Sequence, residues 1–203
     1  MKFVAFSAML CYSLVMQSFA AENPAEPRNS PEDARTAMKH LEPLVGNTYV
    51  AQFPGDQKMT DTVSFESILD GRFIRSVHVV RSADGQAVYR GETIYGYDMR
   101  EGKLFYSYFN TTGGFIYGTG EYKDGAVLWI GENHADQTQP RRTRNETASI
   151  SSDGFTATAY FERDGEWQKR WTLEFKRQPV TTTDSSTADS GEISPARSEK
   201  AGT

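Results

Sequence analysis

The sequence predicts an all-β protein: an antiparallel up-and-down β-barrel of about ten strands, with a short N-terminal helix at one end. Short runs in which apolar and polar residues alternate follow one another from residue 48 to residue 176. Many of these runs are separated by Asp-Gly, a pair that tolerates the positive φ angles of tight hairpin turns. Aromatic residues make up 12% of the 203 residues and glycine occurs 17 times, a balance typical of strands and turns.

Residues 1–20 have the pattern of a signal peptide. Lys2 supplies a positive start, Phe3 to Met16 are mostly apolar, and Ser18-Phe19-Ala20 offers small residues for cleavage. The apolar run is too short and too often interrupted to favour a retained membrane span. We therefore expect cleavage after Ala20 or Ala21 and a bacterial protein that is secreted or periplasmic.

Cysteine and charge restrict the chemistry and the partners. Cys11 is the only cysteine and would leave with the signal peptide, so the mature chain would have no thiol nucleophile, disulfide or cysteine metal ligand. Ala8-Met9-Leu10 is a poor match to a lipoprotein box, so we expect no stable membrane anchor. The formal net charge is -5 without a basic stripe, which argues against nucleic acid as a partner.

A helix is expected after a polar, proline-containing linker at residues 21–29. Ser30 suits the N-cap, Pro31 suits the first helical position, and Asp33 lies where it can complete a cap. Pro43 to Gly46 should end this helix. Its narrow apolar stripe consists of Ala34, Met38 and Leu41.

From Thr48 onward the alternation predicts one strand after another. The expected strands are Thr48–Phe53, Thr62–Leu69, Arg72–Ser82, Gln86–Tyr97, Lys103–Asn110, Phe115–Tyr122, Ala126–Glu132, Arg144–Ser151, Phe155–Arg163 and Glu166–Lys176. Asp-Gly joints lie at residues 70–71, 84–85, 124–125, 153–154 and 164–165. So wide a meander should close into a barrel at residues 30–177, with a two-sheet sandwich as the alternative. The Ser-, Thr- and Asp-rich tail at 178–203 should be disordered.

The alternation also assigns faces to some strands. In the last strand Lys169 lies on the apolar face, between Trp167 and Trp171. In the third strand His78 and Arg75 lie on opposite faces, so only one of them can point inward. The other strands with a clear inner face contribute Phe155, Ala157, Ala159, Phe161, Tyr89, Tyr95 and Tyr97.

Several short motifs resemble known barrels. Leu41-Glu-Pro-Leu-Val-Gly46 resembles the opening of calycin, or lipocalin-like, barrels, although Thr48-Tyr49 stands where those proteins have a tryptophan. The segments 68–73, 89–91, 94–98 and 108–110 are similar to a secreted bacterial family of unknown function with a lipocalin-like barrel. This resemblance covers residues 41–177 and implies a fold without an established chemistry.

A more distant resemblance is to nitrobindin-like barrels, which hold haem through a histidine. The chain has no histidine in its final strands, where that ligand would be expected, so no cofactor is predicted. His134 and Asp136 share one loop but are too few for a metal site. Gly-x-Ser-x-Gly, a phosphate-binding loop and a dinucleotide fingerprint are all missing from the sequence, and no catalytic residue is assigned.

The tyrosines of the central strands favour a cavity for a small apolar or amphipathic ligand, because tyrosine offers apolar area together with a hydroxyl. The alternatives are an enzyme or haem protein that uses His78, and an envelope protein-interaction module whose barrel is filled with side chains. The predicted ligand-binding residues are Tyr89, Tyr97, Tyr108 and Trp171 as lining, with Lys169 or His78 as the polar anchor.

Overall fold

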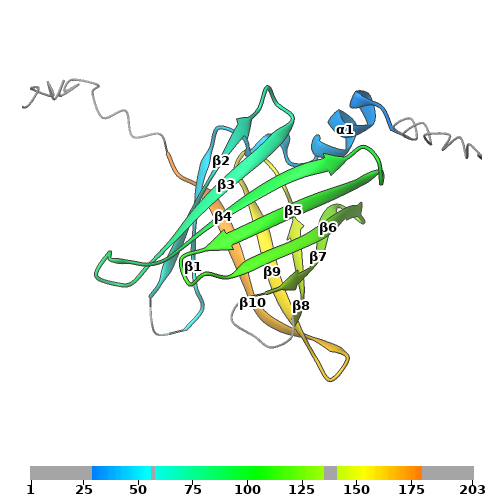
Figure 1. Cartoon of the computed structure of the whole chain (residues 1–203). Coiled ribbons are helices and arrows are strands. Elements are labelled where there is room, and N and C mark those ends of the chain that lie inside the picture. The colour runs from blue at the N-terminus through cyan, green and yellow to red at the C-terminus, as the bar shows by residue number, and fades with distance from the viewer. Residues whose placement is uncertain (1–28, 56–57, 135–140, 180–203) are drawn as a thin grey trace, which may run out of the picture.

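Ten antiparallel strands form one closed barrel in the computed structural model, which describes residues 29–55, 58–134 and 141–179 (Figure 1). Each strand pairs with its neighbours in the sequence, and β1 pairs with β10 to close the ring. The predicted fold class is therefore confirmed. The expected signal peptide, residues 21–28 of the expected linker and residues 180–203 of the expected tail lie outside the described residues.

The predicted strands agree with the observed ones within two residues at each end, except β8, which begins and ends three residues earlier. Polar side chains on both faces of β8 leave no alternation to mark its ends. The observed strands are β1 (Thr48–Gln52), β2 (Thr60–Ile68), β3 (Phe73–Arg81), β4 (Ala87–Asp98), β5 (Lys103–Asn110), β6 (Phe115–Lys123), β7 (Ala126–Asn133), β8 (Arg141–Ala148), β9 (Gly154–Arg163) and β10 (Glu166–Arg177).

Asp-Gly pairs make the tight turns at three of the five predicted joints. At Asp124-Gly125, for example, φ is 52° and 82°, and the pairs at 70–71 and 164–165 are similar. At 84–85 only the glycine has a positive φ, and at 153–154 neither residue has one, because Gly154 already begins β9. The prediction of a tight turn at Asp153-Gly154 is therefore wrong.

The N-terminal segment forms two short helices instead of the single predicted one. Helix α1 (Pro31–Met38) has the expected N-cap: the Ser30 hydroxyl accepts from the Asp33 backbone, and the Asp33 carboxylate accepts from the Ser30 backbone. It ends at Met38, well before Pro43, and the 3-10 helix η1 (Glu42–Leu44) follows. Neither helix in the described part of the chain is long and apolar enough to cross a membrane.

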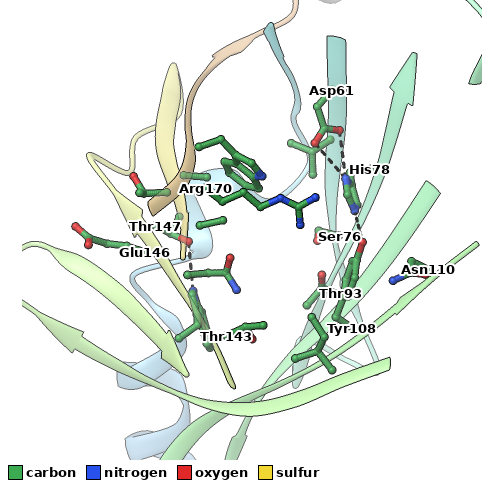
Figure 2. A pocket seen from close by; sticks show the side chains of 18 of the residues that line it. Asp61, Ser76, His78, Thr93, Tyr108, Asn110, Thr143, Glu146, Thr147 and Arg170 are labelled. Carbon is green, nitrogen blue, oxygen red and sulfur yellow. Dashed lines mark hydrogen bonds and ion pairs between the residues drawn. The ribbon is translucent and has the colours of Figure 1, made fainter. Parts of the chain in front are cut away.

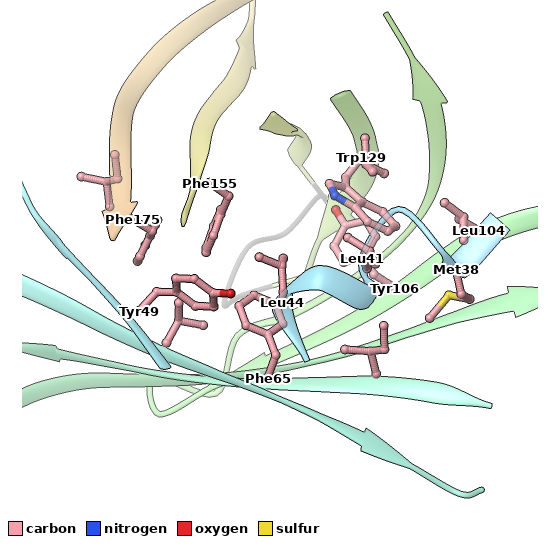
Figure 3. Packing of buried hydrophobic residues seen from close by; sticks show 14 of the residues in the cluster. Met38, Leu41, Leu44, Tyr49, Phe65, Leu104, Tyr106, Trp129, Phe155 and Phe175 are labelled. Atoms are coloured by element: carbon pink, nitrogen blue, oxygen red, sulfur yellow. The ribbon is translucent and has the colours of Figure 1, made fainter. Parts of the chain in front are cut away.

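The barrel end next to α1 and η1 is filled with apolar and aromatic side chains (Figure 3). Leu44 of η1 is completely buried and lies among the rings of Tyr49, Phe65 and Phe155. The Phe155 ring meets Tyr49 edge-on at 5.4 Å and stacks on Phe175 at 4.6 Å between ring centroids. This packing closes one end of the barrel and leaves the interior towards the other end available for a cavity.

We expect Leu44→Ala to lower the free energy of unfolding by about 2–5 kcal/mol, because it leaves a cavity in this closely packed plug. Urea unfolding monitored by circular dichroism measures the change. Leu69→Ala is the matched control, since Leu69 is 67% exposed and its truncation removes no buried contact. Equal effects of the two substitutions would contradict the role of η1 as the plug.

Candidate ligand-binding site

A cavity of about 1080 Å³ occupies the barrel interior above the plug. Leu44, Phe65, Phe155 and Trp129 form its floor, and side chains from most of the strands form its walls. Cavities that hold small molecules in proteins commonly measure about 300–1,000 Å³ and are mainly apolar with a few polar groups. The volume and the lining of this cavity match that description.

Four side chains in the cavity wall form one chain of hydrogen bonds, and Figure 2 shows three of them, Asp61, His78 and Tyr108. The Asp61 carboxylate (β2) lies 3.1 Å from Nδ1 of His78 (β3), and Nε2 of His78 lies 3.1 Å from the Tyr108 hydroxyl (β5). The hydroxyls of Tyr108 and Tyr89 (β4) are hydrogen bonded to each other. Four consecutive strands thus contribute to one polar network inside an otherwise largely apolar barrel.

Gly91 allows this network to form. His78 and Tyr108 belong to β3 and β5, so their side chains meet across β4, over the position of Gly91. A Cβ atom at residue 91 would lie 2.2 Å from His78 Nε2 and 2.5 Å from the Tyr108 hydroxyl, closer than atoms can approach. A residue without a side chain is therefore required where the two polar groups come together.

The proton positions in the network follow from the donor and acceptor properties of its members. A carboxylate only accepts, so Nδ1 of His78 carries the proton that is donated to Asp61. In a neutral imidazole Nε2 then accepts from Tyr108, whose oxygen accepts from Tyr89. If Nε2 also gains a proton, both tyrosine hydrogen bonds reverse and the Tyr89 hydroxyl becomes free to donate into the cavity.

Both tyrosines of the network stay protonated near neutral pH. Burial raises the pKa of Tyr89 above the ordinary range, and the hydrogen bond with Tyr108 and the positive charge of Arg170 partly offset this effect. Burial also raises the pKa of Tyr108, and the hydrogen bond with Tyr89 raises it further. The two hydroxyls are therefore hydrogen-bond donors and not phenolates under physiological conditions.

Arg170 also lines the cavity, and it does so through a β-bulge in β10. Lys169 pairs with Tyr160 and Trp171 pairs with Ala159, so Arg170 has no partner residue on β9. The extra residue reverses the alternation, so that Arg170 and Trp171 line the cavity and Lys169 does not, although Arg170 remains exposed to solvent like Lys169. The prediction that Trp167 and Lys169 share the inner face with Trp171 is therefore wrong.

The structure places the predicted ligand-binding residues in different locations. His78, Tyr89, Tyr108 and Trp171 line the cavity. Tyr97 lies towards the closed end instead, packed against the core beside a smaller pocket near α1. Lys169 is not among the lining residues. A ligand-binding role for the four lining residues stays a prediction.

Sequence reasoning missed four charged residues of the cavity, which are Asp61, Arg141, Glu146 and Arg170. Asp61 is only 6% exposed, and it alternates in phase with Val63 and Phe65 of the same strand, so an earlier start for β2 would have placed it inside. Arg170 gave no such signal, because a bulge adds one residue without a characteristic sequence. The sequence left open whether His78 or Arg75 faces inward. In the structure His78 lines the cavity, and Arg75 lies on the other face of the strand, where it pairs with Glu66.

No metal site was found among the described residues. No three histidine, cysteine, aspartate or glutamate side chains in the described ranges are close enough together to hold an ion. His134 lies 3.9 Å from Glu132 and stacks on Phe115, and Asp136 lies outside the described residues.

The fold and the cavity define a closed antiparallel barrel with an open interior. The chain belongs to the family described as "Protein of unknown function (DUF1579)", whose pattern matches residues 33–177. Among solved structures, the crystal structure of Rv2717c from M. tuberculosis is similar, with a TM-score of 0.52 and 15% identity over 74% of this chain and 99% of that chain. A search of curated proteins gave no match. The structural likeness shows a shared barrel fold.

We expect Gly91→Ala to separate His78 from Tyr108 and to lower the free energy of unfolding by about 1–3 kcal/mol, because the added methyl group overpacks the site. Urea unfolding measures this change. The control is Arg90→Ala at the adjacent, exposed position, where a change within about 0.5 kcal/mol is expected. An unchanged stability of Gly91→Ala would contradict the close approach described here.

The raised pKa values of Tyr89 and Tyr108 predict that both tyrosines ionise only above about pH 10, the ordinary value for the side chain. The unfolded chain loses these protons first, so this effect leaves stability unchanged below pH 10 and lowers it as the pH rises further. Tyrosinate absorbance measures the titration. In the folded protein Tyr108→Phe should reduce the change in tyrosinate absorbance only well above pH 10. In the urea-unfolded protein it should reduce the change near pH 10, where ordinary tyrosines titrate.

Proposed function

We propose that this protein is a secreted or periplasmic lipocalin-like protein that binds a small apolar or amphipathic ligand inside its barrel. The observation that carries the proposal is the cavity of about 1080 Å³, which combines an aromatic floor with one polar network. A cavity of this size is unusual in a barrel whose interior serves only to stabilise the fold, since protein interiors are close-packed.

The two parts of the cavity suit the two parts of an amphipathic ligand. Phe65, Phe155 and Trp129 at the floor offer apolar contact area, and each methylene group that a ligand buries contributes about 0.8 kcal/mol. The hydroxyls of Tyr89 and Tyr108 and the imidazole of His78 offer directional hydrogen bonds higher in the barrel. This division of the wall favours a ligand with one polar end.

An enzyme that uses His78 is the second candidate. The pairing of the His78 Nδ1 atom with the buried Asp61 carboxylate favours it, because such a partner orients an imidazole that acts as a general base. However, Tyr108 occupies Nε2, the atom that would take the proton. An enzymatic function would therefore require Tyr108 itself, or its displacement, to bring the substrate into contact with His78.

Haem does not fit His78 in this arrangement. Both ring nitrogens are hydrogen bonded, and the Tyr108 hydroxyl stands 3.1 Å from Nε2, where an iron atom would have to bind. The other two histidines of the chain stack on rings elsewhere, His40 on Tyr122 and His134 on Phe115. The third candidate, an interaction module with a filled barrel, is disfavoured by the volume of the cavity.

Native mass spectrometry of the protein purified from its own source tests the proposal. We expect a mature chain that starts after Ala20 or Ala21 and an additional mass that disappears on denaturation. A polypeptide mass that includes residues 1–20 would contradict export with cleavage. A bare native mass would contradict a carried ligand.

Filling the cavity should abolish the additional mass. Ala159→Phe adds a ring beside Trp171 inside the barrel, whereas Thr172→Phe adds the same ring on the exposed face of β10. We expect the first variant to lose the ligand and the second to keep it, with circular dichroism confirming that both fold. If Ala159→Phe does not fold, Thr143→Phe on the cavity side of β8 replaces it. Retention of the ligand by a folded, filled variant would place the binding site elsewhere.

A further inference from the structure

Resting on the proposed ligand-binding role, we infer that the ligand carries an anionic oxygen group, and that Arg170 and the Tyr89 hydroxyl bind this group inside the barrel. The ligand class is thus an amphipathic acid, with a carboxylate at one end and an apolar body at the other.

The position of Arg170 is the first observation behind this inference. The β-bulge at Lys169 to Trp171 brings the side chain to the inner side, and Figure 2 shows its guanidinium extending into the cavity towards the strand that carries His78. Bulges recur beside functional sites because they redirect one side chain without disturbing the rest of a sheet. A guanidinium presents several donors in a plane that matches the two oxygens of a carboxylate.

The charge balance of the cavity is the second observation. Apart from tyrosines, five side chains with an acidic or basic group line it: Asp61, His78, Arg141, Glu146 and Arg170. Asp61 is paired with His78, and Glu146 lies 3.6 Å from the guanidinium of Arg144. Arg170 forms no ion pair with any residue in the described ranges. Both carboxylates therefore already have a partner, whereas Arg141 and Arg170 have no counter-ion among the described residues and remain for a ligand.

The proximity of Arg170 to the hydrogen-bond network is the third observation. Its charge acts on the Tyr89 hydroxyl, lowering the pKa of that group against the larger opposite effect of burial. An anion between the two side chains would thus meet a guanidinium from β10 and a hydroxyl from β4, both of which line the cavity.

The network links the binding of an anion to a proton. Tyr89 can donate to the ligand only when Tyr108 donates to Tyr89, which requires Nε2 of His78 to donate to Tyr108. An anion at Tyr89 therefore favours the doubly protonated imidazole. The charged or titratable groups that face His78 are Asp61 from β2, Tyr89 from β4, Tyr108 from β5 and Arg170 from across the cavity.

The apolar body of the ligand would lie against the remaining walls. Trp171, the next residue after Arg170, and Phe161 on β9 both line the cavity, and Phe65, Phe155 and Trp129 form its floor. A body that runs from Arg170 towards the floor would bury apolar surface over its whole length, while its charged end stays beside the polar network. This arrangement excludes ligands with a second charge at the far end, because the floor offers that charge no partner.

Decanoate and decanol provide the test, because they share an apolar chain of equal length and differ in the anionic group. Their binding to the full mature protein is measured by isothermal titration calorimetry at one pH and ionic strength. We expect decanoate to bind at least about tenfold more tightly than decanol, as a hydrogen-bonded charge pair implies. Arg170→Gln should abolish the difference, and Arg170→Lys should restore part of it.

Lys169→Gln is the matched control, since it removes the same charge from the adjacent residue, which does not line the cavity. This variant should bind both probes as the unaltered protein does. Decanol binding as tight as decanoate, or an equal loss in Lys169→Gln and Arg170→Gln, would overturn the anion subsite while leaving the ligand-binding role intact. No binding of either probe would overturn both, because the proposed apolar site would then not accept a simple alkyl chain.

Tyr89→Phe tests the part that assigns Tyr89, because it removes the hydroxyl and keeps the ring. We expect this variant to bind decanoate more weakly and to bind decanol as the unaltered protein does. An unchanged affinity for decanoate would remove Tyr89 from the subsite.

Discussion

The closure of the barrel is the constraint on which the rest of the structure depends. It rests on a short contact, in which β1 pairs with β10 through Tyr49 with Arg177 and Val50 with Lys176, and the Gln178 backbone donates to Thr48 at 2.8 Å. Closure removes the exposed strand edges that a ten-stranded meander would otherwise present. It also encloses an interior wider than the side chains fill, so the chain must either plug that space or leave a cavity.

The protein does both, at opposite ends of the barrel. At one end Leu44 and the surrounding aromatic rings fill the interior, helped by Gly120, where a Cβ would lie 2.3 Å from the Trp129 ring. Towards the other end the inward side chains become polar and hydrogen bond to one another instead of filling space. The stability of the packed end allows the polar end to carry groups whose burial costs free energy.

Asp61 and His78 show how this polar end remains compatible with folding. A buried carboxylate is costly unless it is hydrogen bonded, and here the imidazole supplies that bond while Tyr108, itself hydrogen bonded to Tyr89, satisfies the other ring nitrogen. Arg170 is different, because the described part of the chain provides it with no counter-ion. The proposed anionic ligand would supply Arg170 with the partner that Asp61 and His78 already have within the network.

The sequence by itself determined the order of the strands, most of their ends and the inward face of β9, because a period of two and Asp-Gly joints are local signals. It also identified His78, Tyr89, Tyr108 and Trp171 as candidate cavity residues, all of which line the cavity. Only the tertiary structure decided that Arg170 and not Lys169 points inward, since a bulge depends on the register between two strands. Likewise, Gly91 acquires its role only when β3 and β5 bring two side chains together above it, a contact between segments far apart in the chain.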